Sequence, residues 1–356
     1  MKFGLFGGAQ ATPGDVITEA VLGYHEYGDY VQLAEKLGYS HVWLVEHHFT
    51  GFAQLSATLN YISYLAGRTS TIRLGTAVTV VPWHNPILLA EQVATIDQLS
   101  RGRFDFGVGK GYRFTEFHGF NIDPANLNSI YEESLALIKR SFTETDRWSY
   151  KSDRYQFNDI IVEPPVVQKP YPPMWQGAAS PDSIRKAARD GYNLLLDQHS
   201  PFASVDEKVK IFQDECAKAG RTYDPYAIGV TRGLMVANDD KEREYKHYYR
   251  SRFITEVQTL TKNPSLGEKA FTGGNAHRAG NPRDMSEAAA IIGNGQEMVD
   301  RIGKLYDAGI RQVFMHDLTA SREKLNEALE QFAADVMPKF ADDAKVGAGR
   351  RAAAAE

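Results

Sequence analysis

Short apolar runs alternate with amphipathic stretches along most of this 356-residue chain. The apolar runs are rich in β-branched and aromatic residues, which is typical of buried parallel strands. The amphipathic stretches repeat their apolar positions every three or four residues, which is typical of helices that pack on a sheet. We expect strands at Phe3–Gly7, Val42–Val45, Ile72–Val81, Arg103–Val108, Pro173–Gly177, Asn193–Asp197, Tyr226–Val236 and Arg311–Met315. We expect helices at Tyr27–Leu37, Ala57–Arg68, Ile87–Leu99, Ile130–Phe142, Ser180–Gly191, Val205–Ala219, Asp240–Leu260, Gln296–Asp307 and Arg322–Met337.

Eight strand–helix units without a linker predict an α/β fold, a (β/α)8 barrel with insertions at its C-terminal face. Residues 109–128 are rich in glycine and aromatic residues and have no clear period, so we expect a long loop there. Residues 148–173 look like an inserted antiparallel hairpin. We expect one domain over residues 1–340 and a frayed tail at 341–356. A doubly wound sheet is disfavoured because no G-x-G-x-x-G follows the first strand.

Composition and charge exclude several classes of protein. The formal net charge is −5 with no dense Lys/Arg stripe, which disfavours a nucleic-acid surface. The apolar N-terminus is far too short for a signal peptide or a membrane span, so we expect a cytoplasmic location. Cys216 is the only cysteine, which excludes an internal disulfide and a cysteine metal cluster. It lies in a helical pattern and is expected to be a packing residue.

The second strand ends abruptly in three ionisable residues, Glu46, His47 and His48. A barrel strand delivers such side chains to the mouth, and histidine can exchange a proton near neutral pH. These residues are therefore candidates for acid–base catalysis, and the alternative is a satisfied pair at a strand end. Neighbouring residues on a strand point to opposite faces, so His47, His48, His84 and Glu46 do not predict a three-ligand metal site.

Two further segments point to a phosphate. Lys110 follows the glycines of the fourth strand, and its point charge suits a phosphate. Ser180-Pro181-Asp182-Ser183 opens a helix, whose free backbone N–H groups make an anion site. A simple bend and an ordinary helix cap are the alternatives for each segment alone, but together they favour phosphate binding.

The motifs V-W-L-V-E-H-H-F-T, I-D-Q-L-S-R-G-R-F-D-F-G-V-G-K-G and D-V-M-P-K-F resemble those of the bacterial luciferase-like flavin monooxygenases, most closely the luciferase α-subunit type. The resemblance covers nearly the whole chain. It implies a barrel that binds reduced FMN, reacts it with O2 and oxygenates a small organic substrate through a flavin hydroperoxide. Since no nicotinamide-binding domain is visible, a separate NAD(P)H:flavin reductase would supply FMNH2.

The resemblance also implies roles for single residues. His47 matches the family's catalytic histidine, Ala77 and Val78 fall at its non-proline cis peptide beneath the flavin ring, and the segment Lys262–Ala290 matches its mobile loop. The flavin phosphate would lie on Lys110, Ser180 and Ser183. Tyr112, Ala179 and Gly109 would line the flavin pocket.

Several positions depart from luciferase. Gly109 stands where luciferase has its reactive cysteine, Ala179 replaces a glutamate, and Asp197 and Gln198 replace a Ser–Trp pair. These changes remake the substrate side, so aldehyde oxidation with light emission is not implied. The aromatic residues Trp43, Trp83, Tyr112, Phe114, Phe117 and Trp175 hint at an apolar ligand.

The assembly and the chemistry leave alternatives open. A homodimer is expected through the second and third helices, where an apolar bundle face could be made by Leu59, Ile62, Leu65, Leu89 and Val93; the alternative is that these side chains pack on the barrel. A deazaflavin-dependent dehydrogenase or reductase could use the same barrel for hydride transfer. A non-catalytic flavin-binding subunit is the third possibility, and the presence of His47 argues against it.

Overall fold

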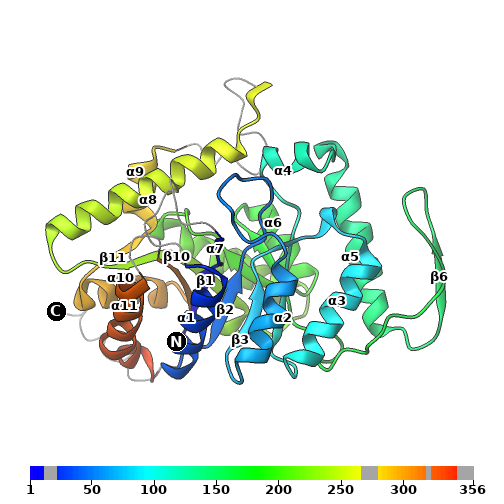
Figure 1. Ribbon diagram of the computed structural model, residues 1–356, viewed down its shortest axis with the longest axis horizontal. Coiled ribbons are helices and arrows are strands. Elements are labelled where there is room, and N and C mark those ends of the chain that lie inside the picture. The colour runs from blue at the N-terminus through cyan, green and yellow to red at the C-terminus, as the bar shows by residue number, and fades with distance from the viewer. Residues whose placement is uncertain (12–21, 266–279, 318–321, 343–356) are drawn as a thin grey trace.

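Eight parallel strands close into a barrel in the computed structural model, which describes residues 1–11, 22–265, 280–317 and 322–342 (Figure 1). Each strand pairs with the next in the order below, and the last pairs with the first. This confirms the (β/α)8 barrel that the alternating pattern predicts. The strands are β1 (Lys2–Gly7), β2 (His41–Leu44), β3 (Arg73–Thr76), β5 (Phe104–Gly109), β8 (Met174–Ala178), β9 (Asn193–Leu196), β10 (Ile228–Val236) and β12 (Gln312–His316).

Helices surround the strands, and their ends follow local capping chemistry. Asn85, Ser180 and Asn281 cap three helices that begin with a proline, and Asn294 forms a capping box with Glu297. Among the described residues, no helix is both long and apolar enough to cross a bilayer. The helices are α1 (Tyr24–Lys36), α2 (Thr58–Arg68), α3 (Pro86–Leu99), α5 (Leu127–Thr143), α6 (Pro181–Arg189), α7 (Val205–Lys218), α8 (Asp240–Thr261), α10 (Gly295–Asp307) and α11 (Arg322–Asp335).

The insertions differ in part from the expectation. Residues 109–128 are not a plain loop, because they contain the helix α4 (Phe114–Gly119) and a short 3₁₀ turn. Six residues are too few for helical periodicity to show in a sequence. The hairpin is confirmed as β6 (Trp148–Lys151) and β7 (Gln156–Ile160), and Figure 1 shows it projecting away from the barrel.

Further short elements lie beside the barrel. β4 (Thr79–Val80) pairs with β5, and β11 (Ile291–Gly293) pairs with β10 after the helix α9 (Pro282–Ala289). Of the expected mobile loop Lys262–Ala290, residues 266–279 lie outside the described residues, and Pro282–Ala289 form α9. Residues 343–356 of the expected tail 341–356 also lie outside the described residues. The 3₁₀ turns are Val81–Trp83, Pro124–Asn126, Phe202–Ser204, Pro225–Ala227 and Met337–Phe340.

Large aromatic side chains fill the barrel interior against glycines. The ring centroid of Trp43 lies 5.1 Å from that of Trp175 and 5.4 Å from that of Phe314, and all three side chains are buried. A Cβ added at Gly75 would lie 2.3 Å from the Trp43 ring, and one at Gly229 would lie 2.2 Å from Phe314. Only glycine therefore leaves room for these rings, which we call the aromatic plug.

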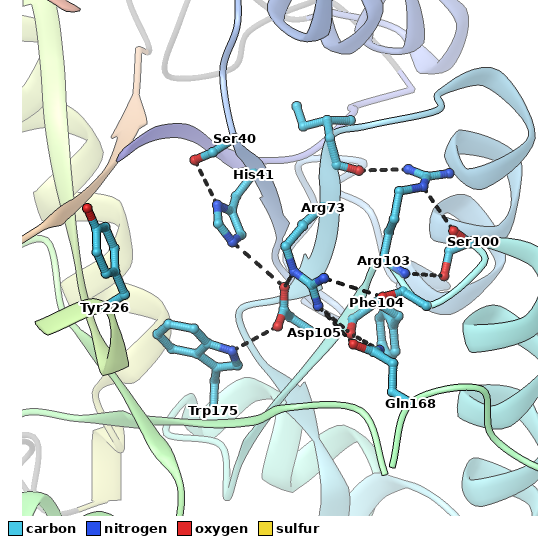
Figure 2. Close-up of polar contacts among 12 residues, drawn as sticks. Ser40, His41, Arg73, Ser100, Arg103, Phe104, Asp105, Gln168, Trp175 and Tyr226 are labelled. Carbon is cyan, nitrogen blue, oxygen red and sulfur yellow. Dashed lines mark hydrogen bonds and ion pairs between the residues drawn. The ribbon is translucent and has the colours of Figure 1, made fainter. Parts of the chain in front are cut away.

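A buried polar cluster closes the N-terminal end of the barrel below the plug. Figure 2 shows Asp105 at its centre, where it accepts hydrogen bonds from Arg73 Nε at 2.6 Å and from Trp175 Nε1 at 3.1 Å. His41 Nε2 lies 3.8 Å from the same carboxylate. Because Trp175 belongs to both groups, the polar cluster fixes the ring position of the plug.

The residues expected to make a dimer face are buried within the single chain. Leu59 is 6% exposed, Leu89 is 1% exposed, and Ile62, Leu65 and Val93 are fully buried in the main hydrophobic core. The alternative is therefore correct: these side chains pack on the barrel. A contact between two copies through α2 and α3 would have to use the outer sides of these helices.

Replacing Gly75 with Ala should destabilise the protein by about 1–3 kcal/mol, the usual range for overpacking a core. The matched control is Gly67→Ala in α2, where an added Cβ meets nothing within 4 Å. This control should be neutral or stabilise by up to about 1 kcal/mol. Urea unfolding monitored by circular dichroism measures both, and equal stability of the two variants would contradict the packing role of Gly75.

Candidate active site

A single cavity of about 690 Å³ opens at the C-terminal ends of the barrel strands. Residues at or just beyond the ends of seven of the eight strands line it, together with Thr231 within β10 and the inner side of α8. The structure brings together every site residue that the sequence predicts. These residues are His47, Ala77, Val78, Gly109, Lys110, Tyr112, Ala179, Ser180 and Ser183.

One end of the cavity carries hydrogen-bond donors for an anion. Ser180 caps α6, where its Oγ accepts a hydrogen bond from the backbone N–H of Ser183 at 3.3 Å. The two serine hydroxyl oxygens lie 2.9 Å apart. Directly after the neighbouring strand β5, Lys110 Nζ donates to Asn128 Oδ1 at 2.8 Å. A helix N-terminus, two hydroxyls and an ammonium group lining one cavity are the donors that a phosphate prefers.

The floor of the cavity lies directly on the aromatic plug. Ala77 and Val78 pack against the plug, and the peptide bond between them is cis, as the resemblance implies. A Cβ added at Gly109 would lie 2.4 Å from Val78 Cγ2, so the missing side chain at this position makes room for Val78. Val78 therefore occupies the space that a side chain at position 109, such as the cysteine of luciferase, would need.

His47 lies in the inner wall of the cavity and is held by a carboxylate. Its Nδ1 is 3.0 Å from Glu116 Oε1, and its ring makes an edge contact with Tyr112. Burial lowers the pKa of His47 from 6.5 to about 4, and the charge of Arg113 acts in the same direction against the opposing effect of Glu116. The ring is therefore neutral at pH 7.

The position of the His47 proton follows from this contact. Since a carboxylate can only accept, Nδ1 carries the hydrogen and donates it to Glu116. Nε2 is then the nitrogen with a free lone pair. A histidine in this state can accept a hydrogen bond or a proton at Nε2, but it has no proton to donate there. Of the acid–base roles expected from the sequence, the structure therefore favours that of a base.

The neighbouring histidine serves a different carboxylate. His48 Nε2 and His84 Nε2 lie 3.1 Å and 3.0 Å from Glu46 Oε1. Burial alone would raise the pKa of Glu46, but the hydrogen bonds and charges of the two histidines lower it below its ordinary value. In the described part of the chain, no group of three or more His, Cys, Asp or Glu side chains is placed to hold a metal ion.

Sequence reasoning missed several polar residues of the site, including Glu116, Arg113, Gln176 and His316. Glu116 is 1% exposed and also accepts a hydrogen bond from the backbone N–H of His48 at 3.2 Å. Arg113 and Gln176 line the cavity and are buried as well. Glu116 and Arg113 lie in the aperiodic segment after the fourth strand. Only the helix α4 brings them to His47, and a charged residue among apolar neighbours was the one signal available.

The chain matches the family model described as luciferase-like monooxygenase over residues 1–312. The 4-hydroxyprotoasukamycin monooxygenase of Streptomyces nodosus subsp. asukaensis is 29% identical, covering 87% of this chain and 86% of that protein. The alkanal monooxygenase alpha chain of Photorhabdus laumondii subsp. laumondii is 27% identical, covering 95% and 97%. The oxygenase component of the flavin-dependent trigonelline monooxygenase of Acinetobacter baylyi is 28% identical and covers 90% of each chain.

Solved structures show the same fold. The monooxygenase RslO1 from Streptomyces bottropensis superposes with a TM-score of 0.79 at 22% identity, covering 96% of this chain and all of that one. An F420-dependent secondary alcohol dehydrogenase superposes with a TM-score of 0.72 at 16% identity, covering 94% and 98%. At these identities the likeness concerns the fold alone.

The low pKa of His47 predicts a pH-dependent stability. Because this pKa is about 4 in the folded protein against an ordinary value of 6.5, unfolding takes up a proton between these values. The contribution of His47 is complete above pH 6.5 and is lost as the pH falls towards 4, with a slope of up to about 1.36 kcal/mol per pH unit. Replacing His47 with Gln should make the decline of unfolding free energy between pH 6.5 and 4 shallower. Urea unfolding at several pH values measures the slope, and identical slopes would refute the assignment.

Proposed function

Because the chain belongs to the luciferase-like monooxygenase family, we propose that it is the oxygenase of a two-component, FMN-dependent system. It would use FMNH2 and O2 to oxygenate a small, largely apolar organic substrate. One observation carries the proposal: the same cavity joins a phosphate-type donor set to a partly buried, neutral histidine. The relative that is named an oxygenase component supports the two-component arrangement. A separate NAD(P)H:flavin reductase would then supply FMNH2.

The residues of the cavity fit FMN. Lys110, Ser180, Ser183 and the N-terminus of α6 would hold the phosphate. The surface formed by Ala77 and Val78 offers a firm apolar support for a flat ring, because the aromatic plug backs it. The cavity volume lies within the range of about 300–1,000 Å³ that is usual for small-molecule sites.

The protein's own groups would do the following. Bound reduced FMN supplies the electrons with which O2 is activated, so that one oxygen atom enters the substrate and the other leaves as water. His47 would present its Nε2 lone pair to the reacting groups and accept a hydrogen bond or a proton there. Glu116 holds the ring in this orientation through Nδ1. The apolar side chains of Phe52, Phe253 and Val257 would keep water from the reaction.

Stopped-flow mixing of the protein with anaerobically reduced FMN and then with O2 tests the proposal. The protein should change the rate of flavin reoxidation and give a transient near-ultraviolet absorbance that differs from free reduced and oxidised FMN. Lys110→Met should raise the Kd for FMNH2 about tenfold, as expected for one charge-assisted hydrogen bond. His47→Gln should leave this Kd within about twofold, because neither His47 nor its partner Glu116 is a phosphate contact. The same variant should shorten the transient, because it removes the Nε2 acceptor.

Lys151→Met on the projecting hairpin is the matched control and should behave as the wild type. Reoxidation identical to that of free FMN would refute the proposal. Tight binding of a reduced deazaflavin in the same preparation, with no effect on FMNH2, would then favour the dehydrogenase or reductase alternative.

We also propose that the chain forms a homodimer through the outer sides of α2 and α3. Leu88 on α3 is 54% exposed, which places an apolar side chain on that surface. Sedimentation equilibrium should give twice the chain mass of 39.7 kDa, and Leu88→Glu should shift the mass towards one chain. A wild-type mass of one chain would show the proposal to be wrong.

A further inference from the structure

The cavity contains a buried cation that the phosphate site does not use. Arg113 lies at the start of α4, lines the cavity and is only 2% exposed. Its Nη1 donates one long hydrogen bond of 3.4 Å to Gln54 Oε1, and its Nε has no hydrogen-bond partner among the described residues. The guanidinium carbon lies 5.8 Å from the centroid of the Tyr112 ring. Most of the donor capacity of this guanidinium is therefore unused.

Arg113 also has no counter-charge in the part of the chain that the structure describes. No carboxylate oxygen of the described residues lies within 4.0 Å of its nitrogen atoms, and the nearby Glu116 is engaged with His47 and the backbone of His48. A guanidinium always carries its charge, and burying it without a partner costs several kcal/mol. Such a group is retained where a ligand supplies the missing anion.

The position of Arg113 separates it from the phosphate donors. Lys110 and the N-terminus of α6 form one end of the cavity, whereas Arg113 lies beside His47, whose pKa its charge lowers. Tyr112 and Phe52 pack with α8 residues in a separate apolar cluster. Within the described residues, this part of the cavity thus combines an apolar wall with the guanidinium of Arg113.

We propose that Arg113 binds an anionic oxygen of the substrate, a carboxylate or an ionised phenol, and holds the apolar body of that substrate between His47 and the wall of α8. The substrate class is therefore an apolar, ring-sized acid. This inference rests on the proposed function, since it assigns the substrate side of the same cavity. Arg113 would set specificity through contact with the substrate.

Benzoate and its neutral analogue benzamide are suitable probes because they differ mainly in charge. Isothermal titration of the FMN-loaded protein should show benzoate binding at least tenfold more tightly than benzamide. Arg113→Gln should bring this ratio close to one while leaving the Kd for FMN within about twofold. Arg113→Lys keeps the charge without the fork geometry, so it should keep a reduced preference for benzoate.

The control Lys151→Gln should retain the wild-type ratio, and thermal unfolding shows which variants fold. If Arg113→Gln does not fold, the comparison of Arg113→Lys with the wild type decides, and an unchanged benzoate Kd in Arg113→Lys overturns the proposal. Equal Kd values for the two probes in the wild type, or an unchanged ratio in Arg113→Gln, also overturn it.

Two sources of the anion are distinguished by the same variants. The charge of the reduced cofactor itself is the other candidate for the partner of Arg113. If Arg113→Gln weakens FMNH2 binding or shifts the flavin midpoint potential while the probe ratio stays unchanged, the guanidinium serves the cofactor and the assignment to the substrate is overturned. Failure of the wild type to bind FMNH2 refutes the proposed function instead. Titration of the flavin-free protein with benzoate and benzamide then still tests Arg113, because the ratio of the two Kd values remains the criterion.

Discussion

Filling the interior of a closed parallel barrel is the constraint on which the rest of this structure depends. Eight strands enclose an interior that side chains must fill, and only above this filled layer can a cavity open at the C-terminal ends of the strands. Here Trp43 and Phe314 meet inside the barrel because Gly75 and Gly229 leave room for their rings. The polar cluster around Asp105 holds this layer from below. The cavity above can remain open because its floor is rigid.

The charged groups above this floor have unequal roles. Glu116 and Glu46 each hold histidines by direct hydrogen bonds, so both carboxylates are engaged within the protein. His47 is consequently fixed and neutral, whereas Arg113 and Lys110 direct positive charge towards the cavity from two different places. A ligand with two separated anionic groups, or two ligands with one each, would complete this electrostatic arrangement.

The sequence predicts the strands to within a few residues because burial on both faces gives continuous apolar runs. It misses the first residue of β2, His41, since this polar side chain belongs to the cluster below the plug. The short helix α4 carries no periodic signal, and its Glu116 reaches His47 only through the fold. Apolar periodicity also cannot distinguish a helix face that meets the barrel from one that meets a partner, as Ile62 and Val93 show. Residues that act together across 69 positions of chain, such as His47 and Glu116, need the folded geometry to be paired.

The stretch from Gly109 to Glu116 has a consequence for how this chain can vary. Eight consecutive positions include the lysine at the anion end, the arginine beside His47 and the carboxylate that orients that ring. Adding or deleting one residue there would displace all of these groups at once, so the length of this segment is fixed more strictly than its composition. The turn between β6 and β7 projects from the barrel and touches none of these groups (Figure 1). Peptide tags, fluorescent labels or loop grafts are therefore best accommodated in that turn.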